Sequence, residues 1–229
     1  MKPLSSISVR PPPLRRHDSS EACVPRAGWP QGLLAALCGL LLALPGVAAN
    51  PLQQPIDVLR EQVAAGIEVL KDPAYDDPAT HAAQRERLCA IANGMFDVYA
   101  FSRLVLMGGW NDFDAAEQDE FVSVFGDFLC RYYLSRLQLY YADEEVRFGA
   151  QEMKSDTQAV VSASVLWQGN SIPVEVRMGR RAGRWRAYDI LVGGISAVLV
   201  YRAQFQPLLL TSSPREIIAD LRRRIAEQG

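Results

Sequence analysis

The residues that could carry out chemistry are few and widely spaced in this 229-residue chain. His81 is the only histidine after residue 50, and no Cys or His residues have the spacing of zinc ligands, so we predict no metal site. Ser102 and Ser196 lie outside any G-x-S-x-G pattern, which argues against a serine nucleophile held at a tight turn. The glycine pairs at 108–109 and 193–194 lack the flanking residues of a phosphate-binding loop. These absences favour a binding protein without a cofactor over an enzyme.

Two acidic residues beside aromatic residues could still serve as the buried acid of an enzyme pocket. Asp97 follows Phe96, and Asp189 follows Tyr188 in a predicted strand. The structural alternatives are a helix N-cap for Asp97 and an ion-pair partner for Asp189, and we favour both of these interpretations. An enzyme that uses either carboxylate remains the alternative function of another class.

The first 49 residues have the pattern of a signal peptide. Five basic residues precede an uncharged stretch of thirteen residues, 32–44, which is too short to span a bilayer. Pro45 and Gly46 end this stretch, and Val47 and Ala49 occupy the small-residue positions before a cleavage site. We therefore predict cleavage after Ala49, export to the periplasm, and a single folded domain at 50–229. Because that domain is net acidic and has no basic run, it is not expected to bind nucleic acid.

Two of the four cysteines, Cys89 and Cys130, remain after this cleavage. In an oxidising compartment such a pair often forms a disulfide. We therefore predict a Cys89–Cys130 disulfide, and two buried free thiols on helices are the alternative interpretation.

The periodicity of the domain changes from helical to alternating near residue 143. Before this point we predict helices at 51–70, 78–94, 97–106 and 114–141, the last opened by Asp114 with Glu117. Alternating strands are predicted at 146–153, 157–167, 171–178 and 184–192, with a hairpin turn at Gly169-Asn170. Two further helices close the chain, and the second begins at Ser213-Pro214. This order predicts an α+β fold in which a curved four-stranded antiparallel sheet packs against several helices.

One face of the predicted sheet mixes small and large apolar residues. Ala159 and Ala163 alternate with Val161, Val165 and Trp167 along a single strand. Small residues on a curved sheet can leave an apolar cavity between the sheet and the helices, which would suit a hydrophobic ligand. An ordinary close-packed core is the alternative interpretation.

Three stretches in the right order resemble the MlaC (toluene-tolerance) family of periplasmic phospholipid-binding proteins. Residues 96–106, FDVYAFSRLVL, are similar to the family pattern F-D-F-x-x-M-x-x-x-V-L-G. Trp110, Phe121, Phe125 and Tyr133 match its spacing of W, F, F and Y. The third stretch, WRAYD with GIS and YRAQF within 185–205, resembles W-k-v-y-D, e-G-v-S and Y-R-s-q-F. The sequence departs from the family pattern at four positions: Met107, Asn111, Gly193 and Val200.

The resemblance implies an MlaC-like lipid-binding domain at 50–229, a carrier that holds phospholipid acyl chains between sheet and helices. Such carriers move lipid between an outer-membrane lipoprotein–porin complex and an inner-membrane ABC transporter. A carrier for hopanoids or other polycyclic lipids would have the same fold with a different pocket. The resemblance also places the helices that carry Cys89 and Cys130 next to each other. Taken with the sequence pattern, it gives twelve expected lipid-binding residues: Leu106, Trp110, Phe125, Leu129, Val161, Ala163, Val165, Val174, Val176, Tyr188, Val198 and Tyr201.

Overall fold

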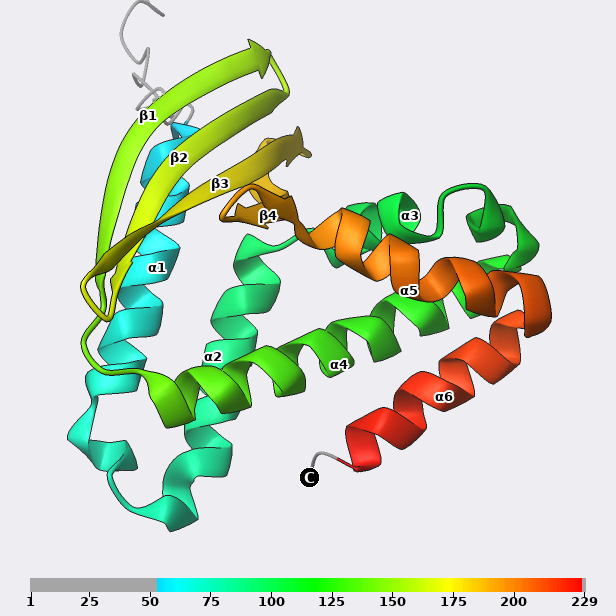
Figure 1. Ribbon diagram of the computed structural model, residues 1–229, viewed down its shortest axis with the longest axis horizontal. Helices are drawn as coiled ribbons and strands as arrows, with labels where there is room; N and C mark the ends of the chain where they lie inside the picture. Colours follow the sequence, from blue (N-terminus) through cyan, green and yellow to red (C-terminus); the bar gives the residue numbers. More distant parts are fainter. Residues whose placement is uncertain (1–52, 228–229) are drawn as a thin grey trace, which may run out of the picture. The chain divides into compact units, whose positions relative to one another are not determined.

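A computed structural model describes residues 53–227 of the chain as six α-helices and a five-stranded antiparallel sheet (Figure 1). The α+β fold class predicted from the sequence is confirmed. The expected export segment, 1–49, and its cleavage site lie outside the described residues. The helices are α1 (Pro55–Lys71), α2 (His81–Met95), α3 (Val98–Leu106), α4 (Ala115–Tyr140), α5 (Ala197–Thr211) and α6 (Pro214–Ala226). The strands are β1 (Glu145–Ser155), β2 (Gln158–Trp167), β3 (Asn170–Arg181), β4 (Arg184–Val192) and β5 (Ile195–Ser196).

Side-chain caps fix where the helices begin. The Asp114 carboxylate accepts a hydrogen bond of 2.9 Å from the Glu117 backbone N–H, and the Glu117 carboxylate accepts one of 3.1 Å from the Asp114 N–H. This capping box starts α4 as predicted, and Ser213 with Glu216 starts α6 in the same way. Asp77 caps only a short 3₁₀ turn, Pro78–Thr80, so α2 begins at His81 and not at the predicted Pro78.

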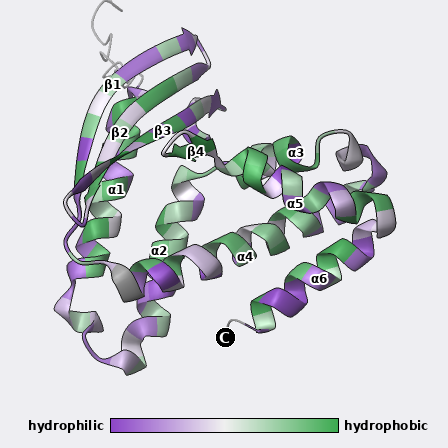
Figure 2. Ribbon diagram, in the orientation of Figure 1, coloured by the Kyte–Doolittle hydropathy of each residue, from purple (hydrophilic) through white to green (hydrophobic). Residues whose placement is uncertain are grey.

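The sheet is a meander in which β1 to β4 pair in sequence order. Ala163 pairs with Val174 and Val165 with Ile172, so the apolar sets of β2 and β3 share one face, as their alternation predicts. Figure 2 shows this alternation of hydrophobic and hydrophilic residues along the strands. The short fifth strand was not predicted. It forms because Gly193 and Gly194 adopt φ values of 57° and 82°, which turn the chain back so that Ser196 pairs with Leu191.

The buried apolar side chains form two separate groups. The first, which we call the sheet core, joins α1 to the inner face of the sheet. The second, which we call the helical core, lies among α3, α4, α5 and α6. The sheet core contains Leu59, Ala159, Val161, Val176, Met178, Trp185 and Ala187. The helical core contains Phe101, Val105, Leu106, Trp110, Phe113, Phe121, Val124, Phe125, Phe128, Val198, Tyr201, Phe205, Ile217, Ile218 and Leu221.

Candidate functional site

An apolar cavity of about 400 Å³ lies next to the sheet core. Its walls come from α1, α2, the C-terminal part of α4 and the ends of β1 and β2. Gln62, Tyr141 and Glu144 are the lining residues with polar side-chain groups. The apolar lining residues are Val63, Gly66, Ile67, Leu70, Leu88, Ile91, Ala92, Met95, Leu134, Leu137, Val146, Val165 and Trp167.

The two helical walls have the same sequence spacing. Apart from Gln62, the cavity is lined on α1 at positions 63, 66, 67 and 70, and on α2 at positions 88, 91, 92 and 95. Both sets follow the i, i+3, i+4, i+7 pattern that places four residues on one helix face. Each helix has a small residue in this set, Gly66 on α1 and Ala92 on α2. A Cβ added at Gly66 would meet no atom within 4 Å, so the helix leaves open space at this position.

The sheet contributes the opposite wall through β1 and β2. Val146 pairs with Val165 across the two strands, and both side chains line the cavity. Trp167, two residues further along β2, also lines it and is 47% exposed. One end of the cavity therefore has a large aromatic side chain in contact with solvent.

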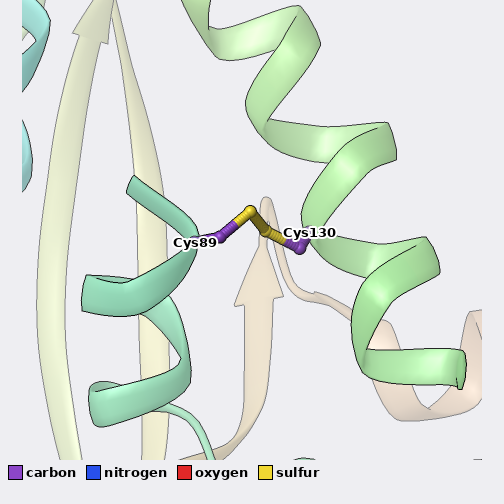
Figure 3. Close-up of a disulfide and its surroundings, with 2 residues drawn as sticks. All are labelled: Cys89 and Cys130. Carbon is purple, nitrogen blue, oxygen red and sulfur yellow. A yellow bond between two sulfur atoms is a disulfide. The ribbon is translucent and has the colours of Figure 1, made fainter. Parts of the chain in front are cut away.

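A disulfide between Cys89 and Cys130 connects two of the helical walls (Figure 3). It joins α2 to α4, with the two Cα atoms 5.7 Å apart. Cys89 follows the lining residue Leu88 directly, and Cys130 lies one helical turn before the lining residue Leu134. The covalent bond therefore limits how far these two walls can separate.

Side-chain hydrogen bonds connect α1, α2 and α4, the three helices that line the cavity. The Gln84 side chain is buried on α2 and donates a hydrogen bond of 2.9 Å to the Val69 carbonyl on α1. The Gln138 amide of α4 donates bonds of 2.8 Å to the Gln84 side chain and 3.0 Å to the His81 carbonyl. These hydrogen bonds hold α1, α2 and α4 together around the cavity.

An exposed ion pair lies beside the cavity where α1 ends. The Lys71 ammonium is 2.8 Å from the Asp143 carboxylate in the segment between α4 and β1. The hydrogen bond and the charge of Asp143 raise the pKa of Lys71 above its ordinary value. The neighbouring residues Leu70 and Tyr141 line the cavity, so this pair connects the chain segments at its edge.

Of the twelve residues expected to bind lipid, Val165 lines the cavity. Four others lie on the same face of the sheet, but Val161 and Val176 are buried in the sheet core, Val174 packs against it, and Ala163 pairs with Val174. Tyr188 is the extra residue of a β-bulge, and its ring lies against Gly179 on the opposite face. Lipid binding by these residues stays a prediction.

The other six expected residues belong to the helical core or pack against it. Leu106 and Phe125 are completely buried there, and the Tyr201 hydroxyl lies 3.1 Å from that of Tyr133. Burial and this hydrogen bond raise the pKa of Tyr201 above its ordinary value. The six are Leu106, Trp110, Phe125, Leu129, Val198 and Tyr201. None of the six lines the cavity, because α1 and α2 cover the sheet at that position.

The two acidic candidates have structural roles. The Asp189 carboxylate accepts hydrogen bonds of 2.7 Å from the Ser196 hydroxyl and 3.1 Å from the Val198 backbone N–H, and it pairs with Arg177 at 3.3 Å. The Asp97 carboxylate accepts a bond of 2.9 Å from the Ala100 N–H and so caps α3. Neither side chain lines the cavity, so the geometry gives no support to an enzyme that uses them.

Two other kinds of feature, a metal site and a membrane-spanning helix, are absent from residues 53–227. No cluster of three or more potential metal ligands is found in this part of the chain. No helix among these residues is long and apolar enough to cross a membrane.

Comparisons with known proteins bear on the fold and the family of this chain. No protein with a curated description matches the sequence at a significant level. A solved structure of the phospholipid-binding protein from Ralstonia solanacearum, in complex with a phospholipid, superposes with a TM-score of 0.63 at 18% sequence identity. The match covers 75% of this chain and 96% of the Ralstonia chain, which shows a shared fold. The sequence model of the MlaC protein family matches residues 60–223. This chain therefore belongs to the MlaC family.

Proposed function

We propose that this protein is a phospholipid carrier that holds acyl chains in the cavity between α1, α2, α4 and the β1–β2 pair. The observation that carries the proposal is an apolar space of about 400 Å³ in a small domain. Pockets for small-molecule ligands usually measure about 300–1,000 Å³ and are lined mostly by apolar side chains. Membership of a family of lipid-binding carriers supports the assignment, as does the phospholipid bound to the Ralstonia protein of the same fold.

The energetics of such a cavity suit reversible lipid binding. Burial of a methylene group contributes about 0.8 kcal/mol, so a cavity that encloses ten methylenes would supply roughly 8 kcal/mol. The bilayer is the competing environment, and it buries both acyl chains of a phospholipid. Burial in the cavity therefore offsets part of the cost of extraction, and a lipid held in this way can be returned to a bilayer.

The same proposal includes a shuttle role outside the cytoplasm. Cleavage of the signal peptide after Ala49 would release residues 50–229 into the periplasm. There the protein would exchange phospholipid with an outer-membrane lipoprotein–porin complex and an inner-membrane ABC transporter. The charge-poor segment 32–44 with its basic flank supports export, and the family resemblance supports the two membrane partners.

Native mass spectrometry of the exported protein with and without a cavity-filling substitution tests lipid carriage. We expect the purified wild-type protein to carry phospholipid. Gly66→Trp should remove it, because the indole would enter the space that this glycine leaves open. Gly108→Trp is the matched control, since a Cβ at Gly108 also meets no atom within 4 Å but this residue does not line the cavity.

Three results would separate the possible functions. Phospholipid in the wild type and the control, and its loss from Gly66→Trp, would support the proposal. A polycyclic lipid such as a hopanoid in the same cavity would change the substrate class. A wild-type protein without lipid, after gentle extraction from the periplasm, would contradict the proposal.

A further inference from the structure

Five arginines lie close together at the end of the β3–β4 hairpin. The segment Val176–Tyr188 has arginines at 177, 180, 181, 184 and 186 and contains no acidic residue. Arg103 on α3 is a sixth, because α3 packs against β4. This concentration of one charge contrasts with the net acidic composition of residues 50–229.

The strand register places most of these arginines on one face. Arg181 pairs with Arg184 and Gly179 with Arg186, so the side chains of Arg181, Arg184 and Arg186 share the face opposite the sheet core. Like charges directly opposite each other on two strands destabilise the pair. The guanidinium groups of these three arginines therefore repel one another unless an anion lies close to them.

Tyr99 of α3 connects the hairpin to the helix on this face. The Arg181 guanidinium lies 5.6 Å from the centre of the Tyr99 ring, and the Arg103 guanidinium lies 6.0 Å from it. Both distances fall within the range of cation–π contacts. The aromatic ring thus holds two guanidinium groups on one surface, where Arg103, Arg181 and Arg184 are exposed.

Five of these six arginines have no acidic partner among residues 53–227. Among the ion pairs found within residues 53–227, Arg177 pairs with Asp189, but Arg103, Arg180, Arg181, Arg184 and Arg186 appear in none. The closest acidic residue along β3 on the same face is Glu175, two residues before Arg177. The charge of the cluster is therefore available to an external anion.

We propose that Arg103, Arg181, Arg184 and Arg186 form a docking surface for a bilayer that contains anionic phospholipids. The cations here are all arginines, whose planar guanidinium groups match phosphate in bidentate geometry, whereas lysine acts as a point charge. A bilayer presents phosphates at high density over an extended surface, which several guanidinium groups can contact at once. An acidic protein surface would offer carboxylates at fixed positions only.

The position of the surface has a consequence for lipid exchange. Gln158 of β2 pairs with Gly179 near the arginines, whereas Trp167 at the other end of β2 lines the cavity. Ten residues of strand separate the two ends, roughly 30 Å at about 3.3 Å per residue. Docking through the arginines would keep the carrier at the membrane and leave the Trp167 end of the cavity uncovered. The inference goes beyond the proposed function, since it does not require that the cavity hold lipid.

Vesicle flotation with purified exported protein tests the docking surface. We expect binding to vesicles of equal parts phosphatidylglycerol and phosphatidylcholine, no binding to phosphatidylcholine alone, and release at roughly 0.5 M salt, where surface charges are screened. Each arginine replaced should weaken binding by roughly tenfold or less. The triple variant Arg181→Gln, Arg184→Gln and Arg186→Gln should therefore bind about 100-fold more weakly than the wild type.

A control with the same loss of charge isolates the effect of position. Arg222, Arg223 and Arg224 of α6 pair with acidic residues, so the triple variant with glutamine at these three positions should bind like the wild type. If the first triple variant does not fold, Arg103→Gln with Arg184→Gln replaces two exposed side chains and should still weaken binding. Gly66→Trp should float with the vesicles, which separates failure of docking from failure of lipid carriage.

Three outcomes would overturn the docking proposal. Equal binding of the hairpin triple variant and the wild type would exclude the arginines as the contact. Equal binding to neutral vesicles would exclude anionic headgroups as the partner. Self-association of the wild type without vesicles, lost in the triple variant, would assign the surface to a second copy of this chain.

Discussion

The helical core and the cavity region are both apolar, but they fill space in different ways. In the helical core the rings of Phe101, Phe121, Phe205 and Tyr201 surround Phe125 with centroid separations of 5.2–5.7 Å. Such edge-to-face and stacked contacts fill the interior to high density. The cavity region has mostly aliphatic walls, with Gly66 on one helix face. The comparison indicates that large interlocking rings give a rigid scaffold, whereas aliphatic walls with a small residue leave room for a ligand.

Truncation of the central ring should have the largest effect on stability. Phe125 is completely buried, so Phe125→Ala should lower the free energy of unfolding by about 3–5 kcal/mol. Chemical denaturation monitored by circular dichroism would measure this loss. Lipid occupancy of the protein that remains folded should stay near that of the wild type, because Phe125 does not line the cavity. Loss of lipid with unchanged stability would place the ligand in the helical core.

Removal of the disulfide should have the next largest effect, because it connects the two regions. Cys89 and Cys130 are 41 residues apart, and closing a loop of this length is worth about 4 kcal/mol in the chain-entropy model. The variant with Ala at both positions should lose roughly 2–5 kcal/mol and carry less lipid. Reduced wild-type protein should behave in the same way. Two labelled thiols in denatured, unreduced wild type would show that the bond does not form in the exported protein.

A substitution of Gly66 that is too small to fill the cavity should have the smallest effect, with the opposite sign. Alanine is more favourable than glycine inside a helix by about 0.5–1 kcal/mol, and a Cβ here meets no atom within 4 Å. Gly66→Ala should therefore raise the midpoint of thermal unfolding slightly and leave lipid occupancy unchanged. A fall in stability would show that the wall at Gly66 is close-packed.

The sequence predicted the elements of this fold well because their signals are local. Alternation of apolar residues identified the strands, and the residue pairs Asp114 with Glu117 and Ser213 with Glu216 identified two helix starts. The partner of each apolar face could not be predicted in the same way. The faces of α1 and α4 both have helical periodicity, and only the tertiary arrangement decides that α1 covers the sheet.

The family resemblance identified the family, but the residues that carry it belong to the helical core and not to the cavity walls. The three stretches that carry it, 96–106, 110–133 and 185–205, build the helical core and its junction with β4. The cavity is lined by residues within 62–95 and 134–167, all of which lie outside those stretches. The sequence signal for the cavity wall on α1 was the helical spacing at 63, 66, 67 and 70. Gly66, within this apolar face, was the signal for open space.

The arginine surface was missed for a related reason. Apart from the adjacent pair Arg180 and Arg181, the arginines of the β3–β4 hairpin are separated by apolar residues and glycine, so they do not form a long basic run in the sequence. The strand pairing brings Arg181 and Arg184 opposite each other, and α3 adds Arg103 from a distant part of the chain. A charged surface of this kind becomes evident only when the register is known.

Cross-linking with a photoactivatable phospholipid tests the location of the ligand most directly. Exported protein loaded with a phospholipid that has a diazirine near the end of one acyl chain would be irradiated, digested and analysed by mass spectrometry. We predict adducts on the cavity walls, at 62–70 of α1 and 88–95 of α2. Adducts confined to α3 and α5, at 98–106 and 197–211, would contradict the assignment of this cavity as the lipid site.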